Sequence, residues 1–200
     1  EGAGGGSVAA IEGELGGRDE PFEVQDYFKP GVREFADVLP PKLARRLLRW
    51  LVPSRWRFGL LLGLGQWVRP LLPASLRVKV PPRRVSGPWP STRRPRLLVA
   101  LAGCAQAAAT PDTNAAAARI LDRLGISLVE APGAGCCGAL PHHLGAEGEA
   151  LAMMRRNIDA WWPQVEAGAE AILVTASGCG VMVKDYGVLL AQVPAYADKA

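Results

Sequence analysis

"RLLVALAGC", residues 96–104, is a short apolar run that ends in a glycine and a cysteine. It has the length and composition of a buried strand. An alanine-rich helix is predicted next, over 111–125, followed by a second strand over 126–131. Strand, helix and strand in this order are typical of parallel strands joined by a right-handed crossover.

The same alternation continues to the end of the chain. A long helical stretch is predicted over 146–169, bent or restarted at Pro163 because proline cannot donate the helical hydrogen bond. A third strand is predicted over 171–176 and a third helix over 180–192. Residues 96–200 are therefore predicted to form an α/β domain with a small parallel, Rossmann-like or flavodoxin-like sheet.

Three segments of different composition precede this domain. Residues 1–30 are rich in glycine and acids and are predicted to be a disordered leader. A basic helical segment, 31–80, has short helices separated by prolines, and its first clear amphipathic helix starts near Pro41. A Pro/Arg-rich linker follows over 81–95. The apolar run 58–68 is not expected to cross a bilayer, which needs about 20 residues.

Charge is concentrated in one part of the chain. The net charge is +4, but residues 29–96 carry sixteen Lys and Arg against two acids. Such a segment binds nucleic acid, anionic lipid or an acidic partner. No nucleic-acid-binding motif accompanies it, so nucleic acid is not expected as a partner. Peripheral contact with a membrane surface and packing on protein both remain open.

Cysteine content indicates the compartment. The chain has 200 residues and only four cysteines, and no secretory signal pattern is found. We therefore expect a reducing, cytoplasmic environment, in which the thiols are free or bound to metal. The chain begins without Met, and we expect it to be a piece of a longer protein.

All four cysteines follow predicted strands. Cys104 follows the first strand, Cys136 and Cys137 the second, and Cys179 the third. Open α/β sheets place their ligand sites at this edge. The turns "LAGCAQ", "GAGCCGA" and "SGCGV" are rich in glycine, which lets the backbone approach a bulky group and leaves amide groups free to face sulfur.

The adjacent pair, Cys136 and Cys137, favours one kind of site. Neighbouring cysteines rarely form a mutual disulfide without strain, and zinc is more often bound by thiols spaced two to four residues apart. In an iron–sulfur cluster, neighbouring thiolates can bind different irons. We therefore expect a cluster on all four cysteines, with a zinc site, a thiol–disulfide redox site or a structural remnant as alternatives.

Four polar residues near the cysteines are further candidates. His142 and His143 could hydrogen-bond to cluster sulfur or replace a thiol, although a helix-capping role is the alternative. Gln106 and Ser177 could hydrogen-bond near the site, with turn and capping roles as the alternative. No residue has the pattern of a catalytic acid or base, and no Gly-x-Gly-x-x-Gly follows a strand.

A family resemblance adds to these interpretations. The order "GC", 31 residues, "CCG" and a further cysteine resembles the cysteine-rich CCG domain found in heterodisulfide reductases and related proteins. The segments "GAGCCGALPHHL", "RRNIDAWWPQVEAGAEAI" and "TASGCGVMVKDYG" resemble, in order, the iron–sulfur subunits of glycolate oxidases. This similarity runs from about Arg94 to Ala200.

The resemblance implies an electron-transfer subunit with an iron–sulfur cluster, of the [4Fe–4S] type. Such a subunit works beside an FAD-containing subunit that oxidises glycolate, and passes electrons towards a quinone or another acceptor. FAD is expected only on that partner. A further small subunit and a place at the inner face of the cytoplasmic membrane are also implied.

Carried over residue by residue, the cluster ligands are Cys104, Cys136, Cys137 and Cys179. The chain departs from the family pattern at Ala176, where a Cys-x-x-Cys ending would place another thiol. Complete relatives also carry a ferredoxin-like module before this region and a second cysteine-rich half after it. The competing hypothesis is a docking module, without a cluster, for the flavin subunit or a membrane surface.

Overall fold

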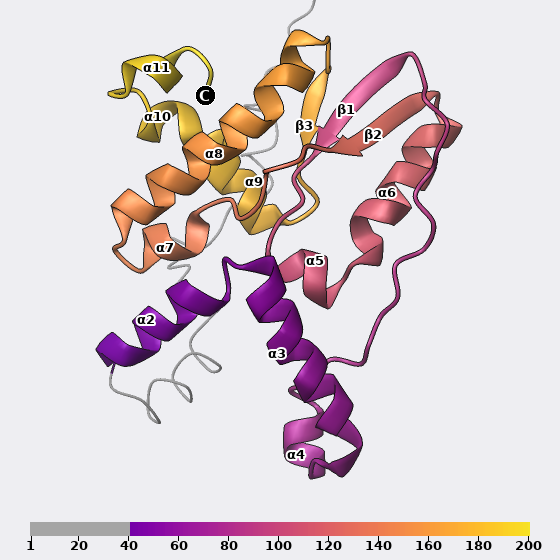
Figure 1. Cartoon of the computed structure of the whole chain (residues 1–200), viewed down its shortest axis with the longest axis vertical. Coiled ribbons are helices and arrows are strands. Elements are labelled where there is room, and N and C mark those ends of the chain that lie inside the picture. The colour runs from indigo at the N-terminus through magenta and orange to yellow at the C-terminus, as the bar shows by residue number, and fades with distance from the viewer. Residues whose placement is uncertain (1–40) are drawn as a thin grey trace, which may run out of the picture. The chain divides into compact units, whose positions relative to one another are not determined.

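The computed structural model describes residues 41–200 (Figure 1). The chain divides into two compact units, 1–44 and 45–200. Of the first unit, only residues 41–44 are described, and they are the start of one helix. The fold described is therefore that of the second unit. The predicted leader, 1–30, lies outside the described residues.

The described part of the predicted basic helical segment, from residue 41 onward, is helical, while its residues 31–40 lie outside the described residues. Its elements are α2 (Pro41–Leu51), α3 (Arg55–Val68), the 3₁₀ turn η2 (Arg69–Leu71) and α4 (Ala74–Arg77). Each break falls at or beside a proline, which cannot supply the hydrogen bond that continues a helix. Among the helices described here, none combines the length and hydropathy needed to cross a bilayer.

The core of the domain is a three-stranded parallel sheet, which confirms the predicted α/β class. Its strands are β1 (Arg96–Ala100), β2 (Ile126–Glu130) and β3 (Ala171–Leu173), in the order β2-β1-β3. In this register, Leu98 of the central strand lies opposite both Leu128 and Ala171. All three strands therefore end at the same edge.

Helices cover both faces of the sheet (Figure 1). Leu98 and Ala100 pack with Ala118 of α6 (Asp112–Arg123) on one face. Val99 and Leu101 belong to the larger core on the other face. That core is supplied by α8 (Glu147–Glu166), α9 (Ser177–Lys184) and α10 (Tyr186–Leu189). The apolar character of every β1 position after Arg96 follows from burial on both faces.

Some predicted helix limits are wrong. Helix α8 continues through Pro163 without restarting. Pro163 lies in the last turn, where little helix remains to be disturbed. The helix predicted over 180–192 is instead the pair α9 and α10, and β3 is shorter than predicted. Three short helices were not predicted: α5 (Ala105–Ala109), α7 (Ala139–His143) and α11 (Pro194–Ala197).

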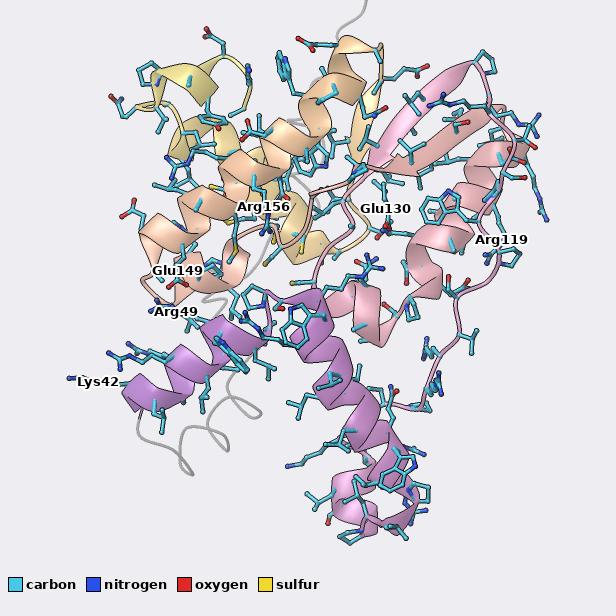
Figure 2. The ribbon with its side chains drawn as sticks, viewed as in Figure 1. Lys42, Arg49, Arg119, Glu130, Glu149 and Arg156 are labelled. Carbon is cyan, nitrogen blue, oxygen red and sulfur yellow. The ribbon has the colours of Figure 1, made fainter. Side chains whose placement is uncertain are left out.

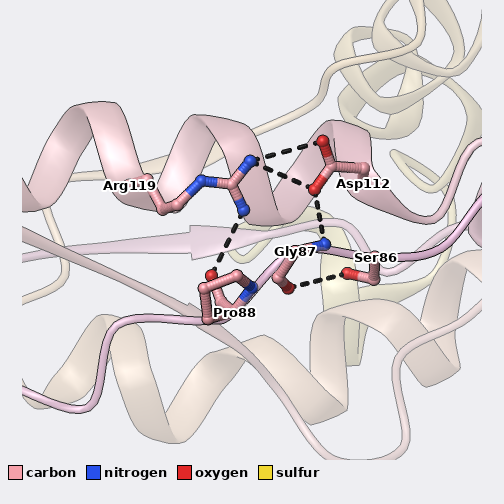
Figure 3. Close-up of polar contacts among 5 residues, drawn as sticks. All are labelled: Ser86, Gly87, Pro88, Asp112 and Arg119. Carbon is pink, nitrogen blue, oxygen red and sulfur yellow. Dashed lines mark hydrogen bonds and ion pairs between the residues drawn. The ribbon is translucent and has the colours of Figure 1, made fainter.

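The linker is attached to the domain by hydrogen bonds. Asp112, at the start of α6, accepts a hydrogen bond from the Gly87 amide at 2.7 Å. It also accepts from Arg119, which in turn donates to the Pro88 carbonyl at 3.2 Å (Figure 3). Gly87 and Pro88 are therefore held on α6.

The next part of the linker follows the outer edge of β2. Trp89 donates from its indole nitrogen to the Leu128 carbonyl at 3.0 Å, and the Arg94 amide donates to the Ser127 hydroxyl at 2.7 Å. Arg94 also donates through its side chain to both carboxylate oxygens of Asp122. The bond from Trp89 gives a partner to a backbone carbonyl of the kind that an open strand edge leaves unpaired.

The Arg94–Asp122 pair gives a pH-dependent prediction. Hydrogen bonding and attraction from Arg94 lower the pKa of Asp122, so this pair stabilises the fold above the ordinary aspartate pKa of about 3.9 and loses its effect as pH falls. We expect Asp122→Asn to lower the urea midpoint at pH 7 and to have a smaller effect at pH 3. Asp185→Asn, at an exposed position, is the control. An equal loss at both pH values would contradict this assignment.

Candidate metal centre

The structure places all four cysteines at the carboxyl edge of the sheet. Cys104 lies between β1 and α5, and Cys136 and Cys137 lie in the loop between β2 and α7. Cys179 is in the first turn of α9, which follows β3. The parallel topology thus brings together thiols that are up to 75 positions apart in sequence.

The thiols are free and close to one another. The Sγ atoms of Cys104 and Cys136 are 3.5 Å apart and share a hydrogen bond. Cys136 and Cys137 are each 2% exposed, whereas Cys104 and Cys179 are half-buried. The adjacent pair therefore forms the floor of the site, and the other two thiols lie nearer to solvent.

Hydrogen bonding among the thiols divides them into proton donors and acceptors. The Cys136 thiol lowers the pKa of Cys104 to about 7, with a further contribution from the Ala105 amide. Cys136, and then Cys179, lower the pKa of Cys137 to about 3. The pKa values of Cys136 and Cys179 are raised by the same contacts. These contacts thus favour the thiolate form of Cys104 and Cys137 and the thiol form of Cys136 and Cys179.

Each neighbouring cysteine interacts with a different loop. Cys136 contacts Cys104, after β1, while Cys137 interacts with Cys179, after β3. Within residues 41–200, no group of three or more His, Cys, Asp or Glu side chains is placed to hold a metal ion. The contacts between thiols therefore link the segments that follow the three strands.

Two glycines lie where the cysteine loop meets α8. Gly138 follows the pair with φ +90°, and a Cβ there would lie 3.1 Å from the Ala150 carbonyl oxygen of α8. A Cβ at Gly135 would lie 2.8 Å from a guanidinium nitrogen of Arg156, which is also on α8 (Figure 2). The loop therefore lies directly against α8.

The remaining candidate residues do not contact the thiols through hydrogen bonds in the described part of the chain. Gln106 donates to Asn114 and Thr175, close to the ends of the strands. His142 and His143 are both in α7, with ring centroids 5.6 Å apart. His142 is half-buried and His143 exposed, and Ser177 is exposed at the start of α9.

Asn157 and Tyr186 are functional candidates that the sequence interpretation missed. Asn157 is completely buried on α8, and Tyr186, on α10, is 2% exposed. Both hydrogen-bond to the backbone of the cysteine loop. A signal existed for Asn157: it falls on the helix face shared by Ala150, Met154 and Trp161, where a polar residue is unusual.

Comparison with known proteins is consistent with this arrangement. The family model described as "Cysteine-rich domain" matches residues 98–184, which include the last three residues of β1, all of β2 and β3, and all four cysteines. Residues 98–184 are thus similar to the cysteine-rich domain family. The cysteine-rich domain therefore coincides with the parallel sheet and its thiol-bearing loops. No solved structure matches the chain.

Two curated proteins extend the similarity beyond the cysteine-rich domain. The chain is 52% identical over 163 residues to the "Glycolate oxidase iron-sulfur subunit" of Escherichia coli strain K12, covering 81% of this chain and 40% of that protein. It is 30% identical over 134 residues to the "Probable glycolate oxidase iron-sulfur subunit" of Bacillus subtilis strain 168, covering 66% of this chain and 29% of that protein. The chain thus spans less than half the length of either relative.

Proposed function

We propose that the chain is part of an iron–sulfur electron-transfer subunit of a glycolate oxidase. The observation that carries this proposal is the gathering of four free thiols, from three strand ends, at one edge of the sheet. The names of the two relatives supply the reaction, oxidation of glycolate.

The donor set fits an iron–sulfur cluster in its chemistry. Cys104, Cys136, Cys137 and Cys179 supply four sulfur ligands, and each neighbouring cysteine can bind a different iron because each faces a different loop. A [4Fe–4S] cluster bound there would supply one-electron transfer. The Ala105 and Ala139 amides, which stabilise the thiolates of Cys104 and Cys137, would favour the ligated form.

Chemistry on the substrate is assigned to a partner in this proposal. An FAD-containing subunit would remove hydrogen from the 2-hydroxy acid, and this chain would carry electrons onward to a quinone or another acceptor. The four thiols lie at an edge with two half-buried members, so electrons can enter or leave without crossing the sheet.

The deciding experiment is anaerobic purification followed by iron and acid-labile sulfide analysis, with an absorption spectrum. It should be done on this chain and on the longest polypeptide that carries its sequence. We expect iron and sulfide in similar amounts. Zinc without sulfide would instead support the zinc alternative, and metal-free protein from both preparations would support the docking alternative.

A second proposal concerns contact with an anionic membrane surface. Trp56 and Trp67 of α3 are 68% and 77% exposed, and the spacing with Leu60 and Leu64 places these side chains on one face of the helix. Arg57 lies over the rings of Trp50 and Trp56, at 4.5 and 5.4 Å. Tryptophan, leucine and arginine together are typical of helices that lie in a lipid interface.

Charge favours lipid as the occupant of this helix face. Residues 41–96 contain many Lys and Arg but no Asp or Glu. Anionic headgroups attract such a segment, at about 1 kcal/mol for each basic residue near the surface. The cytoplasmic leaflet carries headgroups of this kind.

Vesicle sedimentation tests the membrane proposal. We expect the protein to bind vesicles that contain phosphatidylglycerol more than vesicles of phosphatidylcholine alone, because of the basic segment. The double variant Trp56→Ala, Trp67→Ala should bind several-fold less. Val188→Ala, which removes exposed apolar surface from α10, should bind as the wild type does. No preference for anionic vesicles would contradict the proposal. Contact with a protein would then be the alternative for this face of α3.

A further inference from the structure

We propose that Asn157 and Tyr186 are positioning residues that hold the Cys136–Cys137 backbone in the conformation a cluster requires. This inference rests on the proposed function and extends it to residues outside the ligand set. Neither side chain contributes a sulfur, and both act through hydrogen bonds to the backbone of the cysteine loop.

Asn157 holds the loop from α8 through both ends of its amide. Its Oδ1 accepts a hydrogen bond from the Gly135 N–H at 2.8 Å, and its Nδ2 donates to the Cys136 carbonyl at 2.9 Å. The same Nδ2 donates to the Tyr186 hydroxyl at 3.1 Å. The buried Asn157 side chain is thus hydrogen-bonded both to Gly135, just before the cysteine pair, and to Cys136, its first member.

Tyr186 completes the arrangement from α10. Its hydroxyl accepts from Asn157 and donates to the Cys137 carbonyl at 2.7 Å. The carbonyls of both adjacent cysteines are therefore fixed by one connected network. Their thiols interact instead with Cys104, which precedes α5, and with Cys179, in the first turn of α9.

Tyr186 also links two of the cysteine-bearing segments. It lies seven residues after Cys179, on the helix that follows α9, and bonds to the loop that carries Cys137. Its ring lies nearly parallel to that of buried Trp161, with the centroids 6.3 Å apart. The hydroxyl is therefore held by packing as well as by hydrogen bonds, and it couples the two loops whose thiols interact.

Burial makes this network sensitive to substitution. Asn157 is 0% exposed and Tyr186 2% exposed, so a donor or acceptor left without a partner cannot turn to solvent. Groups that orient metal ligands in this way change metal affinity by about 10–100-fold when they are removed. We therefore expect substitutions in this network to affect cluster retention.

The test uses two conservative variants and one matched control. Tyr186→Phe keeps the ring and removes the hydroxyl, and Asn157→Asp keeps an acceptor for the Gly135 amide but loses the amide donor. Tyr196→Phe is the control, because Tyr196 also bonds α8 through its hydroxyl, to Asp159 at 2.9 Å, but on the surface. Each variant is prepared in the longest polypeptide that carries this sequence.

Three measurements are made on each loaded protein. They are the rate of iron release to a chelator, the electron paramagnetic resonance spectrum of the reduced cluster, and its reduction potential. We expect release to be about 10-fold faster or more in Tyr186→Phe and Asn157→Asp. We also expect a changed spectrum and a shifted potential in both variants, because the orientation of the cysteine ligands changes when their backbone supports are lost. Tyr196→Phe should match the wild type.

The outcomes separate this inference from the proposed function. Variants that lose thermal stability but keep the wild-type release rate, spectrum and potential would show that the network supports only the fold, and would overturn the inference. A wild type without iron and sulfide would overturn the proposed function. In that case the part of the inference that concerns a cluster falls as well, and maleimide labelling of Cys136 and Cys137 in the metal-free chain measures whether the network fixes the loop: equal rates in Tyr186→Phe and the wild type would overturn positioning too.

Discussion

Replacing Cys137 with alanine is expected to remove nearly all iron and sulfide from the protein. Cys137 has the most strongly lowered pKa of the four thiols and is buried on the floor of the site. Because groups that merely orient a metal ligand change affinity by about 10–100-fold, loss of a ligand should lower iron content by at least about 10-fold. Iron analysis and the visible absorption of the cluster measure the effect.

Alanine is chosen because it introduces no buried hydroxyl, and the fold should survive. Circular dichroism and thermal unfolding check this point. Ser177→Ala is the matched control, since Ser177 is exposed, lies two residues before Cys179 and donates no hydrogen bond to a cysteine within residues 41–200. Full iron content in Cys137→Ala would contradict the assignment of this thiol as a ligand.

Gly138→Ala is expected to cause the largest loss of stability among single substitutions in the cysteine loop. Gly138 has φ +90°, a conformation that costs a side-chain-bearing residue about 1–2 kcal/mol. The added methyl group would also lie 3.1 Å from the backbone oxygen of Ala150, which cannot rotate away. Together these effects should lower the free energy of unfolding by about 2–4 kcal/mol.

Comparison with Gly145→Ala separates the cost of the positive φ from the cost of the close contact with Ala150. Gly145 has φ +74°, but nothing lies within 4 Å of a Cβ built there. This variant should therefore show the conformational cost alone, about 1–2 kcal/mol. Urea unfolding of both variants gives the comparison. Equal losses would mean that α8 moves away from the loop and that the close approach at Ala150 has no effect.

The order of strands and helices could be predicted because the sequence alternates clearly between short apolar runs and alanine-rich or amphipathic stretches. The ends of the helices and strands were harder to predict where local conformational preferences compete. The helix predicted over 180–192 is interrupted at Asp185, and Gly180 and Gly187 lower the helix propensity on either side. At Pro163 a bend or restart was predicted, but the helix continues, since Trp161 and Ile158 pack on the core and keep α8 in place.

The cysteines could be predicted as a group because parallel strands end at one edge. Their hydrogen-bonded supports could not, since Asn157 and Tyr186 have no spacing relation to the cysteines in sequence. Asn157 faces the loop only because α8 packs with Met154 and Ile158 against the sheet. Such contacts depend on how helices pack, which local patterns do not specify.

The order β2-β1-β3 also has a consequence for when a cluster can be assembled. Cys104, Cys136 and Cys137 leave the ribosome well before Cys179, and β3 pairs with a central strand that lies more than seventy positions earlier. Long-range parallel pairing is slow because the intervening chain must first be brought together. During synthesis, three reactive thiols therefore exist before the fourth is in place, so insertion of a cluster would be a late event that follows closure of the sheet.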